Sequence, residues 1–258
     1  MAHYPDDFIN RLHLIWGPGF LSPGGPHEVR EIVRGLDLRD ALVLDIGCGT
    51  GGPAIVLAHD LGARVVGIDV ESQLINHARR HADQAGVGDR IDFRLVEPGS
   101  LPFAAEMFDV VFSKDALIHI ADKQTLYFDI LRVLKPGGVF AASDWLSGEN
   151  AADDVAFQQF VESAHLGFAM ATAGETARIM RAAGFANVET TDRNRWYADL
   201  SAKEVTEIEG PLREQIIEVS NLETYEQWLV TRRQLADVTR SGGLRSTHLR
   251  GRRPSTAE

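Results

Sequence analysis

The chain of 258 residues contains one cysteine, Cys48, and no long hydrophobic run. A single cysteine excludes an internal disulfide and a zinc centre of several thiolates, and it is typical of the reducing cytoplasm, where we expect the protein to reside. No apolar segment approaches the roughly 20 residues that span a bilayer. The first ten residues carry two aspartates and no apolar core, so we expect no signal peptide.

Positive charge is also scarce, because 26 Lys and Arg stand against 37 Asp and Glu and the formal net charge is −11. Such a chain repels phosphate backbones, so neither nucleic acid nor an anionic membrane surface is an expected partner. Apolar residues make up 44% and charged residues 24%, as in ordinary globular domains. Length and composition predict one soluble domain over residues 1–258, either an enzyme or a ligand-binding protein.

Strands and helices alternate along the first two thirds of the chain. Residues 41–46 and 63–69 read as parallel strands joined by a helix over 53–61. The alternation predicts a Rossmann-like, doubly wound α/β fold with a seven-stranded, mostly parallel sheet. The other expected strands are 91–95, 108–112, 139–143, 186–191 and 244–250; the other expected helices are 71–85, 122–134 and 173–184.

Two segments interrupt this alternation. Residues 151–170 and 194–240 have helical patterns, the second broken near Gly210, and they predict helical lid insertions over the carboxyl edge of the sheet. Pro136, Gly137 and Gly138 predict a turn before the fifth strand. The polar tail 251–258 is expected to fray.

A glycine-rich loop follows the first strand, with Gly47, Gly49 and Gly51 at every second position after Asp45. Glycines let the backbone approach a ligand closely, and the carboxyl edge of an open α/β sheet is where ligands bind. The spacing differs from the G-x-G-x-x-G of dinucleotide folds, and Asp45 at the loop mouth favours a cation over a pyrophosphate. S-adenosylmethionine carries a sulfonium and an ammonium, and Asp69 stands where an acid binds ribose hydroxyls. The alternatives are a nicotinamide enzyme and a turn without a ligand.

The loop resembles the D-x-G-x-G-x-G motif of the class I S-adenosylmethionine-dependent methyltransferases. The resemblance covers about residues 38–145 and includes Asp69 and the segment Leu134–Gly138. It implies S-adenosylmethionine as cofactor. We expect no metal, because methyl transfer from a sulfonium needs no Lewis acid and no cluster of ligands stands at metal spacing. Besides Asp45, Gly47, Gly49 and Asp69, the resemblance implies cofactor contacts by Leu21, Ser22, Val70, Glu97, Pro98 and Ser113, with Glu97 in place of an adenine-contacting aspartate.

Two further segments resemble the phosphoethanolamine N-methyltransferases. They run from Trp16 to Gly25 and from Ser113 to Ile120. The resemblance implies a helical cap over residues 1–36 and a catalytic dyad of Tyr4 and His119. In such a dyad the histidine accepts the proton of the acceptor amine, which is chemically reasonable near neutral pH. Asp115 is expected to hold the amine or to contact the histidine.

The sequence departs from that family where it binds the substrate phosphate. Phe160, Ala164 and Leu166 stand at or near the positions of its tyrosine and arginine, and Trp145 replaces a tyrosine. Only Arg232 or Arg233 remains near the family's lysine. Phosphoethanolamine itself is therefore not the expected substrate.

Aromatic residues of the lid are the expected substitutes, because aromatic faces attract cationic amines. We predict substrate contacts by Trp145, Phe168, Trp196, Tyr197 and one of the two arginines. The alternative for each aromatic residue is a place in the core. The arginine-rich segment 228–253 is either a solvated surface or a cationic wall for an anionic substrate. N-methylation of a small amine is the first hypothesis. The others are O- or C-methylation of a small acid or phenol with His119 as base, and a non-catalytic S-adenosylmethionine-binding protein.

Overall fold

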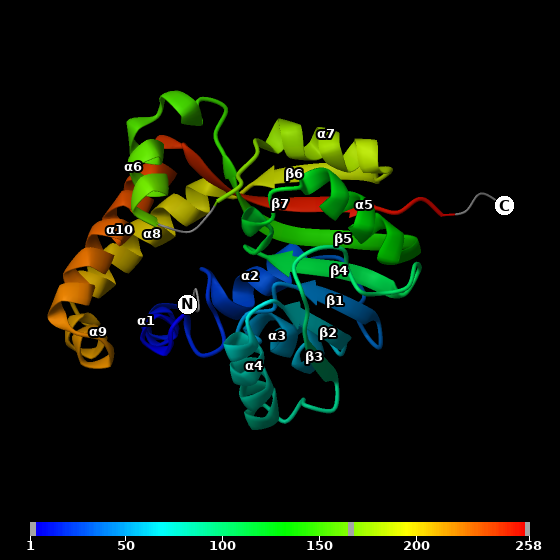
Figure 1. The fold of residues 1–258 in the computed structure, drawn as a ribbon, viewed down its shortest axis with the longest axis horizontal. Coiled ribbons are helices and arrows are strands. Elements are labelled where there is room, and N and C mark those ends of the chain that lie inside the picture. The colour runs from blue at the N-terminus through cyan, green and yellow to red at the C-terminus, as the bar shows by residue number, and fades with distance from the viewer. Residues whose placement is uncertain (1–3, 165–167, 256–258) are drawn as a thin grey trace.

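A computed structural model describes residues 4–164 and 168–255 (Figure 1). Its sheet has seven strands in the order β3-β2-β1-β4-β5-β7-β6. Only β7 runs antiparallel to its neighbours, so the prediction of a seven-stranded, mostly parallel sheet is confirmed. The strands are β1 (Leu42–Ile46), β2 (Arg64–Asp69), β3 (Ile91–Leu95), β4 (Phe108–Lys114), β5 (Leu134–Ser147), β6 (Ala186–Asp192) and β7 (Leu244–Arg252).

Helices cover both faces of the sheet, as a doubly wound fold requires. One apolar cluster includes Val43, Leu57 and Phe112, and a second includes Leu44, Tyr127 and Phe140. Neighbouring residues Val43 and Leu44 belong to different clusters because side chains alternate between the faces of a strand. The helices are α1 (Asp6–Trp16), α2 (Gly25–Ile32), α3 (Gly52–His59), α4 (Ser72–Gln84), α5 (Lys123–Val133), α6 (Val155–Ala164), α7 (Ala173–Ala183), α8 (Asn194–Glu209), α9 (Arg213–Val219) and α10 (Leu222–Ser241), with 3₁₀ turns η1 (Leu117–His119) and η2 (Ala151–Asp153).

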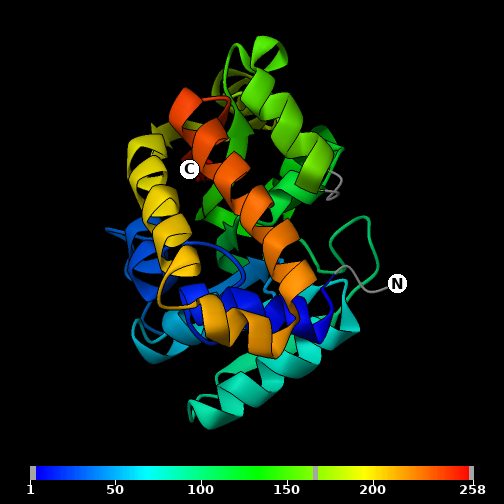
Figure 2. The same cartoon turned by 90° about the vertical axis from the view of Figure 1, so that its left-hand side faces the viewer.

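The helical insertions gather at one end of the sheet. Helices α6, α8, α9 and α10 stand together beyond the ends of the strands, and Figure 2 shows them in front of the sheet with α1 across their lower end. Two small apolar clusters hold them, one around Ile208, Ile216 and Trp228 and one around Phe160 and Leu235. Of the helices in the described ranges, none is long and apolar enough to cross a membrane.

The predicted boundaries of the lid need one correction. Segment 151–170 is not one helix, because η2 precedes α6, and residues 165–167 lie outside the described part of the chain. Segment 194–240 consists of α8, α9 and α10, and the predicted break occurs where α8 ends at Gly210.

The predicted turn at residues 136–138 was wrong, since β5 continues through it with a shift of register. The tail was also predicted wrongly at its start. Strand β7 runs to Arg252, and the Arg253 guanidinium donates to the carbonyl oxygens of Leu131, Arg132 and Leu134. These bonds fix residues 251–253 to the end of α5. Residues 256–258 lie outside the described ranges.

Candidate functional site

The glycine loop turns from β1 into α3 with three residues in the left-handed region. The φ angles of Gly47, Gly49 and Gly51 are +71°, +53° and +89°. A side chain at Gly47 would place its Cβ 2.3 Å from the Cβ of Ala116, and one at Gly49 would lie 3.1 Å from Leu21. The loop is therefore confined by protein atoms on two sides, besides requiring a backbone that favours glycine.

Asp45 lies at the end of β1 beneath this loop and is 1% exposed. Within the described ranges, neither of its carboxylate oxygens has a hydrogen-bond partner. Burial, together with the nearby charge of Asp69, raises the pKa of Asp45 to about 8. A buried acid without a partner is costly, so this position favours a ligand that brings a positive charge.

Asp69 ends β2, next to the loop. One of its oxygens accepts the Gly49 N–H at 3.0 Å and the other accepts the Glu71 N–H at 3.0 Å. Burial raises its pKa against the lowering effect of these bonds. Val70, Glu97 and Pro98, the other residues predicted on this side, are exposed at the ends of β2 and β3, which are neighbours in the sheet.

The N-terminal segment closes the loop from the other side. The Gly52 N–H donates to the carbonyl oxygen of Gly19 at 2.8 Å. The predicted residues Leu21 and Ser22 line the cavity described next. The Ser113 hydroxyl, in contrast, donates to the carbonyl oxygen of Ile46 and is fully buried, so this side chain holds β4 to β1.

A cavity of about 200 Å³ lies between the carboxyl ends of β4 and β5, helix α1 and the lid. It is small for a ligand site, since sites for drug-sized molecules commonly exceed about 300 Å³. All three predicted catalytic residues, Tyr4, His119 and Asp115, line it. Its other walls are mostly aromatic or apolar and come from Phe8, Leu12, Trp16, Leu21, Ile118, Trp145, Phe160, Phe168, Trp228 and Leu235, with Ser22, Ser163, Thr231 and Arg232 as polar members.

Tyr4 and His119 line the cavity from distant parts of the chain. Tyr4 precedes α1, and burial together with Asp69 and Glu71 raises its pKa to about 12. The phenol therefore stays protonated through the physiological range. His119 ends the turn η1 after β4, and its ring lies 5.7 Å from that of Phe168.

Asp115 occupies a strained position, with a φ of +55°. Its carboxylate accepts the Ser143 hydroxyl at 2.7 Å and the Lys114 ammonium at 2.9 Å. The same ammonium donates to the Ser22 hydroxyl and the Pro23 carbonyl oxygen. Asp115 is thus a fixed, charge-balanced wall of the cavity, and such strain is often found at functional sites.

Two of the predicted substrate aromatics face the cavity and two do not. Trp145 and Phe168 line it. Tyr197 is fully buried behind Trp145, with the ring centroids 5.6 Å apart. Trp196 packs against Gly24 under the Arg193 guanidinium, 4.9 Å from its ring. The prediction of substrate contacts was therefore wrong for Trp196 and Tyr197, whose rings join α8 to its neighbours.

The two candidate arginines also separate. Arg232 lines the cavity, pairs with the buried Glu204 at 2.6 Å, and lies 5.1 Å from the Trp16 ring. Arg233 points outward and pairs with Glu209 at the surface, so Arg232 is the one of the two that reaches the cavity. The remaining arginines of segment 228–253 bond surface acids or backbone carbonyls; they are Arg240, Arg245, Arg250, Arg252 and Arg253.

Sequence reasoning missed the apolar face of α1 and a buried lysine. Phe8, Leu12 and Trp16 all line the cavity, and their spacing of four residues was a readable helical stripe. Lys114 is 5% exposed and neutralises Asp115. No periodic signal distinguishes such a lysine from a surface one.

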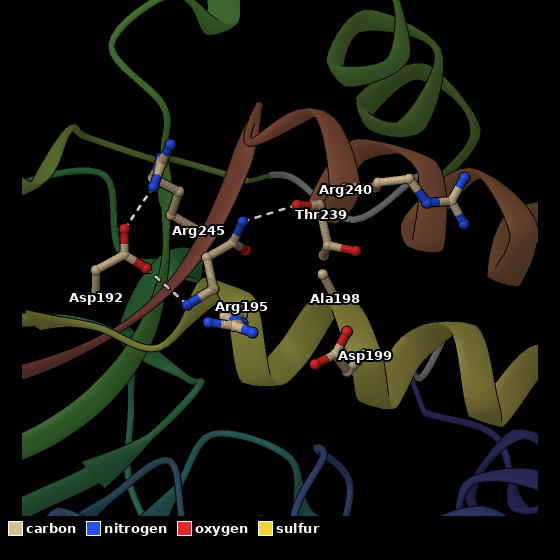
Figure 3. A pocket seen from close by; sticks show the side chains of 8 residues that line it. Asp192, Arg195, Ala198, Asp199, Thr239, Arg240 and Arg245 are labelled. Carbon is tan, nitrogen blue, oxygen red and sulfur yellow. Dashed lines mark hydrogen bonds and ion pairs between the residues drawn. The ribbon is translucent and has the colours of Figure 1, made fainter.

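A second cavity, of about 410 Å³, lies between the start of α8 and the end of α10 (Figure 3). Arg195, Asp199 and Arg240 line it, together with the ion pair of Asp192 and Arg245. None of the residues predicted for catalysis or binding lies on its walls. The predicted chemistry therefore belongs to the smaller cavity at the carboxyl edge.

Comparisons with known proteins agree with this geometry. A family described as a methyltransferase domain matches residues 38–195. Phosphoethanolamine N-methyltransferase 3 of Arabidopsis thaliana is 31% identical over 227 residues, which are 87% of this chain and 45% of the relative. Sterol 24-C-methyltransferase of Pneumocystis carinii is 29% identical over 204 residues, 73% of this chain and 52% of that protein. The chain spans less than half the length of the plant relatives that it matches.

Solved structures show the same fold. Phosphoethanolamine N-methyltransferase 2 of Haemonchus contortus, in complex with phosphomonomethylethanolamine and S-adenosylhomocysteine, superposes with a TM-score of 0.90 at 23% identity, covering 98% of this chain and 59% of that one. A candidate sarcosine dimethylglycine methyltransferase of Galdieria sulphuraria gives 0.83 at 20% identity, with 98% of both chains covered. This chain therefore belongs to the methyltransferase-domain family and has the Rossmann-like fold of the class I S-adenosylmethionine-dependent methyltransferases.

Proposed function

We propose that the protein transfers a methyl group from S-adenosylmethionine to the nitrogen of a small amine. The observation that carries this proposal is the meeting of Tyr4, His119 and Asp115 in one small aromatic cavity next to the glycine loop. The relatives named phosphoethanolamine N-methyltransferases support nitrogen as the acceptor atom.

The residues beneath the loop fit this cofactor. Asp45 offers buried carboxylate oxygens that have no partner within the described ranges, which suits the cofactor's positive charges. Asp69 would accept its ribose hydroxyls, and Leu21, Val70, Glu97 and Pro98 would border it. When bound, S-adenosylmethionine supplies an electrophilic methyl group on a sulfonium.

The residues of the acceptor cavity would allow proton transfer from the amine to a base. A protonated amine has no free lone pair, so its nitrogen must first lose a proton, and the His119 imidazole would accept it. Tyr4, held protonated by its raised pKa, would orient the amine by a hydrogen bond. Trp145 and Phe168 present aromatic faces that attract the cationic form, each worth about 0.5–2 kcal/mol.

Arg232 would provide a second binding contact for the acceptor. Its guanidinium lines the cavity, and one of its nitrogens donates to Glu204. A carboxylate on the acceptor could bond to this guanidinium, whereas Phe160, which lines the cavity at or near the positions of the family's tyrosine and arginine, is apolar. A carboxylated small amine therefore fits this cavity better than a phosphorylated one.

The test is methyl transfer from labelled cofactor to matched acceptors. We expect transfer to small amines, with a lower KM for a carboxylated amine than for the same amine without the carboxylate, and the difference should disappear in Arg232→Met. Transfer only to phenols, acids or sterols would contradict N-methylation and favour the O- or C-methylation hypothesis. Cofactor binding without any transfer would favour the non-catalytic alternative.

Asp69→Ala should weaken cofactor binding by about 10- to 150-fold. The variant loses charge-assisted hydrogen bonds to the ribose, worth about 1.5–3 kcal/mol. Calorimetric titration measures the change, with Asp92→Ala as the control, because Asp92 is an exposed acid on the adjacent β3 that pairs with Arg94. Equal affinities for the two variants would refute the ribose assignment.

Asp45→Asn should stabilise the cofactor-free protein at pH 8 while weakening cofactor binding. The pKa of Asp45 is raised from 3.8 to about 8, so the stability lost through this shift is absent below pH 4 and grows as the pH rises toward 8. Removing a cost of about 1–3 kcal/mol would raise Tm by roughly 2–10 °C. Thermal melts should separate variant and wild type at pH 8 and bring them close together at pH 4; a constant difference would contradict the raised pKa.

A further inference from the structure

Hydrogen bonds from residues outside the turn hold the turn that carries His119. Turn η1 spans only Leu117–His119, so its own hydrogen bonds fix little. The Ile118 N–H donates to a carboxylate oxygen of Asp144 at 3.1 Å, and the Lys123 ammonium donates to the carbonyl oxygen of Leu117. A third bond, from the Ala169 N–H to the Ile118 carbonyl oxygen at 2.8 Å, joins the turn to the lid.

Asp144 and Lys123 are both buried, at 1% and 8% exposure. Neither lines the acceptor cavity, so neither would contact a substrate. Burying a carboxylate and an ammonium is costly, and apolar residues of similar size would commonly be at least as stable. Both side chains form hydrogen bonds with backbone groups of Leu117 and Ile118, the two residues that precede His119.

Neighbouring residues connect Asp144 to the acceptor cavity. Burial raises its pKa to about 7, as does the charge of Asp115, whereas Lys123 and the N–H groups of Ile118 and Trp145 lower it. Burial and the charge of Asp144 raise the pKa of the Tyr127 phenol on α5. The residues flanking Asp144 on β5 serve the cavity too, because the Ser143 hydroxyl holds Asp115 and Trp145 is a wall.

We propose that Asp144 and Lys123 are positioning residues that fix the backbone of η1 and so direct the His119 imidazole into the acceptor cavity. This inference rests on the proposed function of His119. It assigns a role to two buried charged residues that otherwise contribute nothing to catalysis.

The test compares Asp144→Ala with Asp144→Asn, whose amide oxygen can still accept the Ile118 N–H. Because small misplacements of a catalytic group can cost about 10²-fold, we expect Asp144→Ala to lower kcat by roughly 10- to 100-fold and Asp144→Asn to keep it within about threefold. Cofactor affinity should change less than about twofold in both, since none of the residues of η1 is among the predicted cofactor contacts. Lys123→Met should also lower kcat, which keeps the proposal testable if Asp144→Ala does not fold.

The matched control is Asp129→Ala. Asp129 is a buried acid that also accepts a backbone N–H, that of Leu101, but on α5 and away from the cavity. It should lower Tm and leave kcat unchanged. If Asp144→Ala and Lys123→Met only lower Tm in the same way, their role is structural and the positioning proposal is overturned.

A second readout needs no turnover. The imidazole NMR signals of His119, identified by their loss in His119→Ala, should shift in Asp144→Ala and stay in place in Asp129→Ala. If the signals shift but no amine is methylated even by the wild type, the proposed function fails while the positioning of His119 stands. Unmoved signals together with unchanged kcat would overturn the positioning.

Discussion

His119→Ala should lower kcat by about 10²- to 10⁴-fold and leave cofactor affinity nearly unchanged. General-base assistance is typically worth that factor, and the imidazole faces the acceptor cavity, whereas the predicted adenosine contacts lie at Asp69 and beyond β3. Steady-state kinetics and calorimetric titration measure the two quantities. Tyr4→Phe is the companion variant: it removes one hydroxyl, keeps the ring that closes the cavity, and should cost less.

The pH dependence identifies the base. The rate of the wild type should rise with pH, because a general base must be unprotonated to accept a proton, and this slope should vanish in His119→Ala. Tyr4 cannot produce the slope, because its pKa is raised to about 12. Asp144, with a pKa of about 7, could, so the slope must persist in Asp144→Asn. A His119→Ala variant with full rate and the same pH profile would show that the likeness to the phosphoethanolamine enzymes is one of architecture alone.

Gly47→Val should abolish cofactor binding. A branched side chain at a φ of +71° is strained, and its Cβ would lie 2.3 Å from the Cβ of Ala116, so the loop must move away from its present path. Gly49→Val should act in the same way through Leu21, 3.1 Å from the added Cβ. Calorimetric titration should detect no binding by either variant.

Gly174→Val is the matched control. Gly174 lies on α7, has an ordinary φ, and a Cβ there would meet nothing closer than 3.9 Å. It should bind the cofactor as the wild type does. Circular dichroism of all three variants separates loss of the site from loss of the fold. Tight binding by a folded Gly47→Val protein would place the cofactor elsewhere.

Strands β1, β2 and β4 were predictable because each is a short, mostly apolar run that ends at or just before a glycine or an aspartate. The loop of Gly47, Gly49 and Gly51 was predictable for a related reason, since a backbone at positive φ accepts few other residues. The prediction that the tail frays from residue 251 was wrong because composition does not reveal hydrogen bonds to distant carbonyls, such as those of the Arg253 guanidinium.

The acceptor cavity was only half predictable. Tyr4, His119 and Asp115 were found by a motif, but consecutive helical residues point about 100° apart, and the sequence does not say which of them faces inward. Arg232 and Arg233 are such a pair, one on the cavity wall and one at the surface. Trp196 and Tyr197 are both turned away from the cavity, because packing of α8 against its neighbours decided their directions.

NMR of isotope-labelled products tests N-methylation directly. The protein is incubated with S-adenosylmethionine labelled with ¹³C at the methyl carbon and with ¹⁵N-labelled small amines, carboxylated and not, and the products are examined by NMR. We expect a new methyl signal with one-bond ¹³C–¹⁵N coupling, absent in Gly47→Val and strongly reduced in His119→Ala. A methyl signal without that coupling, when oxygen or carbon acceptors are supplied alongside, would contradict N-methylation.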